Sequence, residues 1–288
     1  MEWLTRMNDA LDLMERHMEE SIGIEEIARA ACSSPFHFQR MFNILTGMTV
    51  AEYMRRRRLT LAAQELAVSS AKVVDVALKY GYDSPESFAK AFRRLHGISP
   101  SEARDPDVPL KACPRISFHL SLKGDKEMDY RIVEKEAFTV VGKTIRVSLE
   151  NCEEPGQQVP RFWQECNING TTGRLASLSR DGHVLGICLD MRPDKEDYTY
   201  MIGAESRPDA DASGLELREI PASTWAVFTA VGPMPDAVRN VFQRVFQEWF
   251  PSTGFEHAGK PEFERYPDGD TTSADYRCEV WVPVVKKG

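Results

Sequence analysis

The sequence predicts a two-domain protein. We expect an all-α tandem helix-turn-helix domain over residues 1–104 and an α+β domain with an antiparallel sheet and two related halves over residues 128–288, joined by residues 105–127 as a linker and edge strand. Three observations predict this fold class. A helix-turn-helix pattern occurs twice, the apolar period changes from helical to alternating after Pro109, and 288 residues can form two hydrophobic cores.

The repeat fixes the architecture of the first domain. Its two copies lie fifty positions apart and read Ser34-Pro35-x-x-Phe38-x-x-x-Phe42-x-x-x-x-Gly47 and Ser84-Pro85-x-x-Phe88-x-x-x-Phe92-x-x-x-x-Gly97. The serines are placed as N-caps, the prolines at the first helical position and the glycines where a left-handed residue ends a helix. The phenylalanines, four apart, share one helix face. These repeated residues are therefore predicted to be scaffold.

The opposite face of the first repeated helix carries base-reading chemistry. Arginine and glutamine make bidentate contacts with guanine and adenine edges, and an aromatic ring can pack on a thymine methyl group. The residues on this face are Phe36, His37, Gln39 and Arg40. The alternative is a merely solvated helix face.

The corresponding face of the second helix favours phosphate contact. It combines acidic, hydroxyl and cationic groups, namely Glu86, Ser87, Lys90, Arg93 and Arg94. Cations clamp phosphates, while a glutamate can accept from a cytosine amine. Between the copies, residues 49–69 predict a long helix in which some of the arginines 55–58 face solvent or phosphate.

The charge is divided between the domains. Residues 1–104 have no net charge, and residues 105–288 carry the whole net charge of −8. The second domain would therefore repel a phosphate backbone and is not expected to bind nucleic acid.

Cysteine usage and hydropathy exclude other classes. Six cysteines (32, 113, 152, 166, 188 and 278) are scattered without a C-x-x-C pair, so we expect no metal, no cofactor and reduced thiols. An apolar signal and a membrane-length apolar run are both missing, which is typical of a cytoplasmic protein.

The second half alternates strands and helices. Ile116, Phe118, Leu120 and Leu122 predict an edge strand before a turn at Gly124-Asp125. Further strands are expected at 130–133, 138–147, 183–191, 198–204, 224–231 and 277–285, with helices at 159–167 and 235–250. The order of strands, helix and strands occurs twice and predicts two related halves.

With these motifs in place, residues 3–104 resemble the DNA-binding domain of the AraC/XylS transcription regulators. The likeness is carried by the run 37–42, Gly47, Tyr53-Met54, Arg58-Leu59, Ala62, the run 77–84 and Gly97-Ile98-Ser99-Pro100. It implies that the helices at 35–44 and 85–95 enter adjacent major grooves of duplex DNA. Because the two reading faces differ, the DNA site should be asymmetric, with two boxes about one helical turn apart. The first helix should supply most of the specificity and the second mainly grip.

Residues 128–286 resemble the GyrI-like, or AraC-type effector-binding, domain. The matching segments include 130–133, 186–190, 220–222, 249–255, 261–266 and 279–284. The resemblance implies an aromatic-rimmed pocket for lipophilic, often cationic, small molecules. Glu279 is the expected partner of a ligand cation, with Glu264 and Tyr266 as second choices and Trp163, Tyr200, Phe228 and Trp281 as walls. The alternative is that the aromatics are plain core and Glu279 is a satisfied strand residue.

The resemblances together predict a regulator that is not an enzyme. A small effector would modulate DNA affinity or the recruitment of RNA polymerase. One alternative is a DNA-tethered hydrolase with Glu279 as general base. Another is an architectural DNA binder whose second domain docks a protein, which a pocket filled by large side chains would favour.

Overall fold

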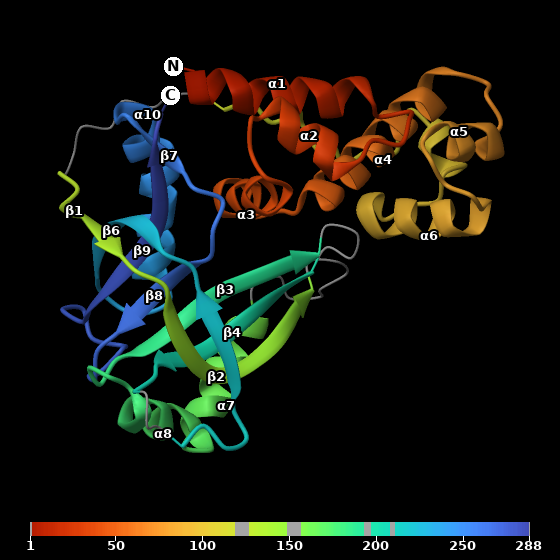
Figure 1. Ribbon diagram of the computed structural model, residues 1–288. Helices are drawn as coiled ribbons and strands as arrows, with labels where there is room; N and C mark the ends of the chain where they lie inside the picture. The colour runs from red at the N-terminus through yellow and green to blue at the C-terminus, as the bar shows by residue number, and fades with distance from the viewer. Residues whose placement is uncertain (1, 119–126, 149–156, 193–196, 208–210, 288) are drawn as a thin grey trace. The chain divides into compact units, whose positions relative to one another are not determined.

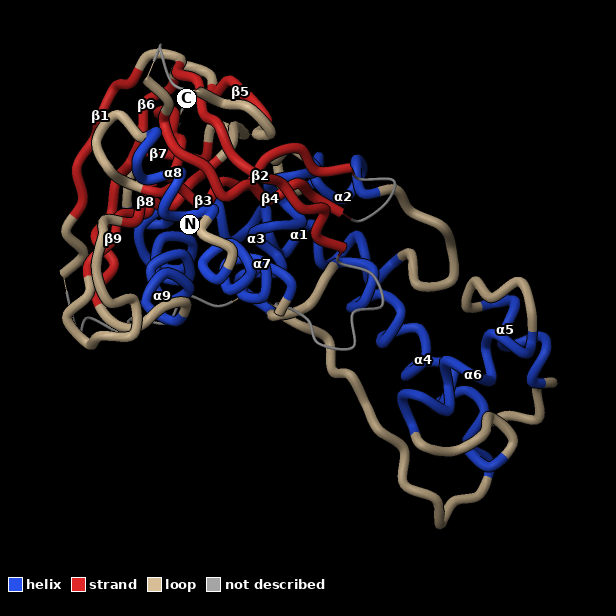
Figure 2. Tube along the Cα trace, turned by 90° about the horizontal axis from the view of Figure 1, so that it is seen from below, coloured by secondary structure: helices blue, strands red, loops and turns tan. Residues whose placement is uncertain are grey.

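The protein divides into two compact units, Met1–His119 and Leu120–Gly288. The computed structural model describes residues 2–118, 127–148, 157–192, 197–207 and 211–287 (Figure 1). The strands drawn in Figure 2 lie between residues 130 and 286, in the second unit, whereas the described residues of the first unit form only helices and loops. The predicted all-α and α+β classes are both confirmed.

The first unit contains six α-helices among its described residues. In chain order they are α1 (Glu2–Arg16), α2 (Ile24–Ala30), α3 (Pro35–Thr46), α4 (Val50–Val68), α5 (Val73–Lys79) and α6 (Pro85–His96), followed by the short 3₁₀ helix η1 (Glu102–Arg104). The tandem pairs are α2–α3 and α5–α6, and α4 connects them.

The repeated caps define both ends of α3 and α6. The hydroxyls of Ser34 and Ser84 each accept a hydrogen bond from the backbone N–H three residues on, at 3.3 and 3.1 Å. Gly47 and Gly97 end the helices with φ angles of 71° and 82°, in the left-handed region that glycine adopts without strain. The scaffold role predicted for these residues is confirmed.

The repeated phenylalanines form the cores of the two pairs. Phe38, Phe42, Phe88 and Phe92 are fully buried. The ring centroids of each pair lie 6.0 and 5.5 Å apart. Each helix places its two phenylalanines four residues apart on one face. Burial of these rings therefore stabilises each helix pair.

The arginine run on α4 is only half exposed. Arg57 binds the carboxylate of Glu15 at 2.7 and 2.9 Å, and both side chains are largely buried. Arg58 donates from Nε to the carbonyl of Met18 at 2.9 Å, at the end of the first helix. Arg55 and Arg56 are exposed. Two of the four arginines thus hold α1 against α4, and two face solvent.

Residues 109–118, which we call the strap, lie along the helical unit. The strand predicted at Ile116 and Phe118 is wrong, because 109–118 forms no strand. Instead, Asn8 of α1 exchanges two hydrogen bonds of 3.0 Å with the backbone of Phe118, and the N–H of Cys113 donates to Thr60 of α4 at 2.9 Å. These side chains satisfy backbone groups that a sheet would otherwise pair. The predicted Leu120, Leu122 and Gly124-Asp125 turn lie outside the described residues.

The second unit is built on one antiparallel sheet. Its strands are β1 (Tyr130–Lys135), β2 (Phe138–Ser148), β3 (Val184–Arg192), β4 (Asp197–Glu205), β5 (Glu216–Ile220), β6 (Ser223–Val231), β7 (Phe255–His257), β8 (Glu262–Tyr266) and β9 (Arg277–Lys286). Their order is β1-β6-β9-β8-β3-β4-β2-β5, and β7 pairs with β9. The order is unchanged when β1, β2, β3 and β4 are exchanged with β5, β6, β8 and β9. The predicted two related halves are therefore confirmed.

Helices cover one face of the sheet. They are α7 (Gln158–Ile168), α8 (Thr171–Leu178), α9 (Asp236–Arg244), the π-helical turn η3 (Val245–Trp249) and α10 (Phe250–Ser252). Trp163 of α7 contacts Tyr266 of β8, with ring centroids 5.1 Å apart, and Trp249 of η3 contacts Phe228 of β6 at 5.2 Å. The sequence missed α8, β5, β7 and β8 as elements.

The other face of the sheet is concave. Phe138 of β2 touches Phe263 of β8, with ring centroids 5.9 Å apart, although β4 and β3 lie between those strands. Lys135 of β1 binds Glu205 of β4 at 2.9 Å across four intervening strands. The sheet must therefore curl to bring these side chains together.

Candidate functional site

Helix α6 presents its predicted polar face to solvent. Ser87 and Lys90 are exposed, as are Glu86, Arg93 and Arg94, while Phe88 and Phe92 point into the core. The helix is thus firmly anchored on one side and carries three cationic side chains on the other. Their contact with DNA stays a prediction.

Helix α3 presents less of its predicted face. Phe36 and Arg40 are partly exposed, but His37 and Gln39 are 8% and 4% exposed. His37 lies one turn before the buried Met41, and Gln39 three residues before Phe42, so both side chains flank the apolar stripe. Phe36 and Arg40 are therefore the more accessible of the four residues expected to read bases.

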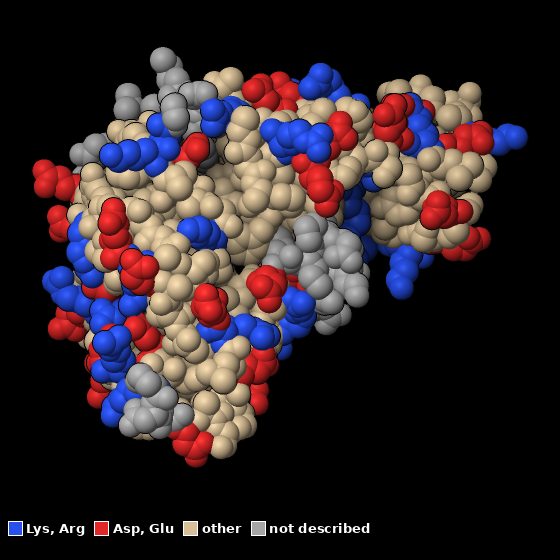
Figure 3. Space-filling model, viewed as in Figure 1, with Lys and Arg blue, Asp and Glu red and all other residues tan. Residues whose placement is uncertain are grey.

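The second unit has a cavity of about 260 Å³ on the concave face of its sheet. Aromatic and aliphatic side chains alternate with charged ones around it. The lining residues are Arg131, Val133, Lys135, Phe138, Asp181, Leu185, Glu205, Phe263, Arg265 and Trp281. In Figure 3 acidic and basic side chains are interspersed over the visible face of this unit, without a broad patch of one sign.

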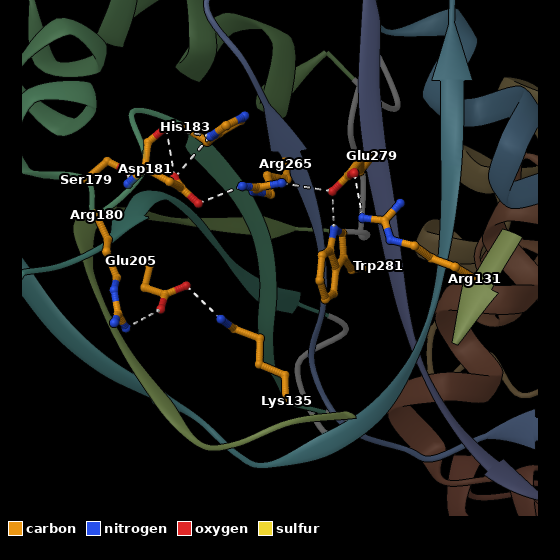
Figure 4. A network of polar contacts seen from close by, with 10 residues as sticks. All are labelled: Arg131, Lys135, Ser179, Arg180, Asp181, His183, Glu205, Arg265, Glu279 and Trp281. Atoms are coloured by element: carbon orange, nitrogen blue, oxygen red, sulfur yellow. Dashed lines mark hydrogen bonds and ion pairs between the residues drawn. The ribbon is translucent and has the colours of Figure 1, made fainter. Parts of the chain in front are cut away.

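Glu279 is the centre of an ion-pair network beside this cavity (Figure 4). Its Oε1 accepts from Arg131 at 2.6 Å, and its Oε2 accepts from Arg265 at 3.1 Å and from Trp281 Nε1 at 2.9 Å. Partial burial alone would raise the pKa of Glu279, but these donors outweigh it and lower the pKa below its usual value. The carboxylate is therefore ionised and engaged within the protein.

Two further carboxylates bind cations around the cavity. Asp181 accepts from Arg265 at 2.6 Å, and this arginine with other donors outweighs burial and holds the pKa of Asp181 well below its usual range. Glu205 binds Lys135 at 2.9 Å and lies 3.7 Å from Arg180. The polar wall is consequently a set of ion pairs.

The seven predicted ligand residues do not share one cavity. Glu279 and Trp281 lie on the concave face, and Trp281 lines the cavity. Trp163, Tyr200, Glu264 and Tyr266 meet on the helix-covered face, and Phe228 packs there beside Trp249. Cross-strand partners face the same way, and Glu264 is paired with Val280, the residue after Glu279. The expectation of a common pocket is therefore not met among the described residues.

The group on the helix-covered face is a tight polar contact. Tyr200 is 4% exposed, accepts from Trp163 Nε1 at 2.9 Å and donates to Glu264 at 3.3 Å. Burial and the nearby Glu264 carboxylate raise the pKa of Tyr200 well above its usual value, so it stays a hydroxyl donor. Gly186 lies directly beneath the pair. This cluster reads as structural support for the sheet.

The sequence missed most residues of the cavity. Arg131, Val133 and Lys135 form an alternating run on β1 that could have indicated one shared face. Arg265 lies in the segment 261–266 that resembles the GyrI-like domain, but its pairing with Glu279 depends on the β8–β9 register. Asp181 precedes β3 and carried no local signal.

The described residues offer neither a metal site nor a membrane span. Within them, no cluster of three or more histidine, cysteine or acidic side chains is arranged to hold a metal ion. No helix in the described part of the chain has the length and hydropathy needed to cross a bilayer.

Family models and relatives agree with both units. Residues 128–285 match the GyrI-like small molecule binding domain, and residues 27–105 match a helix-turn-helix domain. Transcriptional regulator Rob of Salmonella typhimurium is 25% identical over 289 residues, covering 96% of this chain and 97% of Rob. The HTH-type transcriptional activator AarP of Providencia stuartii is 40% identical over 102 residues, which are 35% of this chain and 76% of AarP.

A solved structure is similar over about half of the chain. SAV2435 bound to tetraphenylphosphonium is 28% identical, with a TM-score of 0.49, over 55% of this chain and 94% of that protein. The GyrI-like match spans more than half of the chain, and Rob and AarP are both transcription regulators. The chain is an AraC/XylS family transcription regulator with a helix-turn-helix region in front of a GyrI-like small molecule binding domain.

Proposed function

We propose that α3 and α6 bind two adjacent major grooves of an asymmetric DNA site, and that the concave cavity binds a small effector. Effector binding would change DNA affinity or the recruitment of RNA polymerase, with a coupling free energy of about 1–3 kcal/mol. The observation that carries the DNA part is the repeated, capped scaffold with unlike exposed faces on α3 and α6. The open cavity supports the effector part.

The two helices should contribute differently to DNA binding. Arg40 is the arginine on the face of α3, so Arg40→Ala should weaken binding by about 1–3 kcal/mol and relax the preference at one base. Lys90 is exposed on α6, and a lysine ammonium binds phosphate as a point charge. Lys90→Ala should weaken binding to all DNA sequences alike. It should also reduce the slope of log K against the logarithm of the salt concentration by about 1.

Fluorescence anisotropy on duplexes selected from a random pool, repeated over a range of salt concentrations, tests this division. Arg218→Ala, an exposed arginine on β5, is the matched control and should leave both quantities unchanged. Retention of the wild-type base preference and affinity in Arg40→Ala would contradict the reading role of α3.

The geometry gives the two alternatives little support. Glu279 is bound by two arginines and an indole, and its lowered pKa makes it a weak general base for a hydrolase. For an architectural DNA binder we would expect large side chains to fill the pocket, whereas a cavity of about 260 Å³ is open in this domain. Regulation by a small molecule is the function that the site supports best.

A further inference from the structure

Each carboxylate around the cavity is paired with a cation of the protein. Both oxygens of Glu279 accept from arginine or indole donors, Asp181 accepts from Arg265, and Glu205 lies between Lys135 and an arginine. A cationic ligand would have to displace one of these protein cations. Removing a partner from such a pair costs more than the new contact gains unless the replacement is equally well placed.

The cations, by contrast, have donors to spare. Arg131 has several N–H groups, but among the described residues it makes one hydrogen bond, through Nη2 to Glu279. The ammonium of Lys135 likewise makes one, to Glu205. The side chains of Arg131 and Lys135 are 49% and 27% exposed, so a ligand can reach both.

The charges around the cavity balance. Arg131, Lys135 and Arg265 line it together with Asp181 and Glu205, and Glu279 lies beside it in the network of Figure 4. Arg180, which pairs with Glu205, is 74% exposed and is not among the lining residues. Three cations against three carboxylates leave no net negative charge to attract a lone cation.

The apolar part of the cavity suits a small hydrophobic body. Phe263 and Trp281 are stacked, with ring centroids 5.2 Å apart, and Phe138 lies edge-on to Phe263 at 5.9 Å. Arg131 lies 5.8 Å from the Trp281 ring centroid, and Lys135 lies 4.4 Å from that of Phe138. Each free donor is therefore placed beside an aromatic surface. A volume of about 260 Å³ is slightly below that of drug-sized sites, about 300–1,000 Å³.

We infer that the effector is a small amphiphilic anion, a carboxylate on an aromatic or aliphatic body, whose charged end binds Arg131 or Lys135. This inference rests on the proposed role of the cavity as the effector site. It replaces the sequence-based expectation that Glu279 recruits a cation. In this arrangement Glu279 orients Arg131, and the ligand carboxylate takes the donors that Glu279 leaves open.

Calorimetry on the full-length protein with three matched probes tests the assignment. The probes are 4-phenylbutyrate, 4-phenylbutylammonium and neutral 4-phenylbutanol, which share one body and differ in charge. We expect the carboxylate to bind at least about tenfold more tightly than the ammonium, the factor that one charge-assisted hydrogen bond typically contributes.

Substitutions distinguish an anion-binding from a cation-binding cavity, because the two assignments predict opposite changes in carboxylate affinity. Arg131→Gln should weaken carboxylate binding about tenfold. Lys135→Gln should also weaken it, and this variant replaces Arg131→Gln as the test if Arg131→Gln folds poorly. Glu279→Gln should strengthen it severalfold, because it removes a negative charge and releases Arg131. Arg218→Gln, in an exposed pair with Glu216, is the control and should have no effect.

The outcomes separate the inference from the proposed function. Tighter binding of the ammonium, or weaker carboxylate binding by Glu279→Gln, overturns the anionic assignment and leaves the cavity as an effector site. If none of the three probes binds the wild-type protein, the cavity itself loses its role as a ligand site. The DNA-binding measurements with Arg40→Ala are independent of either result.

Discussion

Gly186 on β3 is a position where one added methyl group should disrupt the buried packing of the second unit. A Cβ built there lies 2.5 Å from Glu264 Oε2 and closer still to the Tyr200 hydroxyl. Real Cβ atoms essentially never approach that closely, and both neighbours are at most 6% exposed. Gly186→Ala must therefore shift Tyr200 or Glu264.

The cost can be worked from the contacts that must change. Overpacking a close-packed interior costs about 1–3 kcal/mol. Moving the Tyr200 hydroxyl also weakens its hydrogen bond with Trp163, which contributes about 1 kcal/mol. The expected loss is therefore about 2–4 kcal/mol. For a domain of this size, that lowers Tm by roughly 5–15 °C.

Differential scanning calorimetry of the full-length protein measures this shift in the transition of the second unit. Gly173→Ala is the matched control, because Gly173 lies in α8 with nothing within 4 Å of an added Cβ. It should stabilise by about 0.5–1 kcal/mol through helix propensity. Tyr200→Phe removes the clashing hydroxyl and should restore part of the loss in the double variant. A wild-type Tm for Gly186→Ala would refute the packing described here.

Two further predictions concern the helical unit. Ser84→Ala removes the N-cap of α6 and should lower the free energy of unfolding, measured by urea denaturation, by about 1 kcal/mol. Ser84→Asp keeps a capping oxygen and should lower it little. Equal losses in the two variants would rule out capping. The pKa of Glu15 is lowered by Arg57 and Tyr53 despite opposing burial. The contribution of Glu15 to the free energy of unfolding is therefore complete above its unfolded pKa of 4.5. It falls as the pH drops through the lower pKa that Glu15 has in the folded state. The stability difference between wild type and Glu15→Gln should shrink below pH 4.5, and a pH-independent difference would contradict the ion pair.

Local signals predicted the helical unit almost completely. The N-cap serines, the prolines behind them and the left-handed glycines act within a few residues, so both ends of α3 and of α6 are visible in the sequence. The same reasoning failed for the strap, where Ile116 and Phe118 alternate like a strand. Their backbone partners are side chains of α1 and α4 far away in sequence, including Asn8, so the pattern carried no trace of them.

The cavity could be predicted only in part for a related reason. The alternation within β8 and β9 shows that Glu264 and Arg265 face opposite ways, as do Glu279 and Val280. It does not show whether Glu279 shares a face with Glu264 or with Arg265. That depends on the pairing register, in which Arg265 lies opposite Glu279. A shift of one residue would exchange the partners, and the connection 267–276 between β8 and β9 is too long to fix the register as a two-residue hairpin turn does.

The register also decides the chemistry of the cavity. Had Glu279 shared a face with Glu264, two carboxylates would have met among aromatic rings, an arrangement suited to a cation. Because Glu279 instead faces Arg265 and Arg131, its charge is used to hold two guanidiniums beside Trp281. The residue that made a cation receptor plausible in the sequence therefore orients the donors of an anion site in the fold. The sign of the effect of Glu279→Gln on carboxylate binding follows from that register alone.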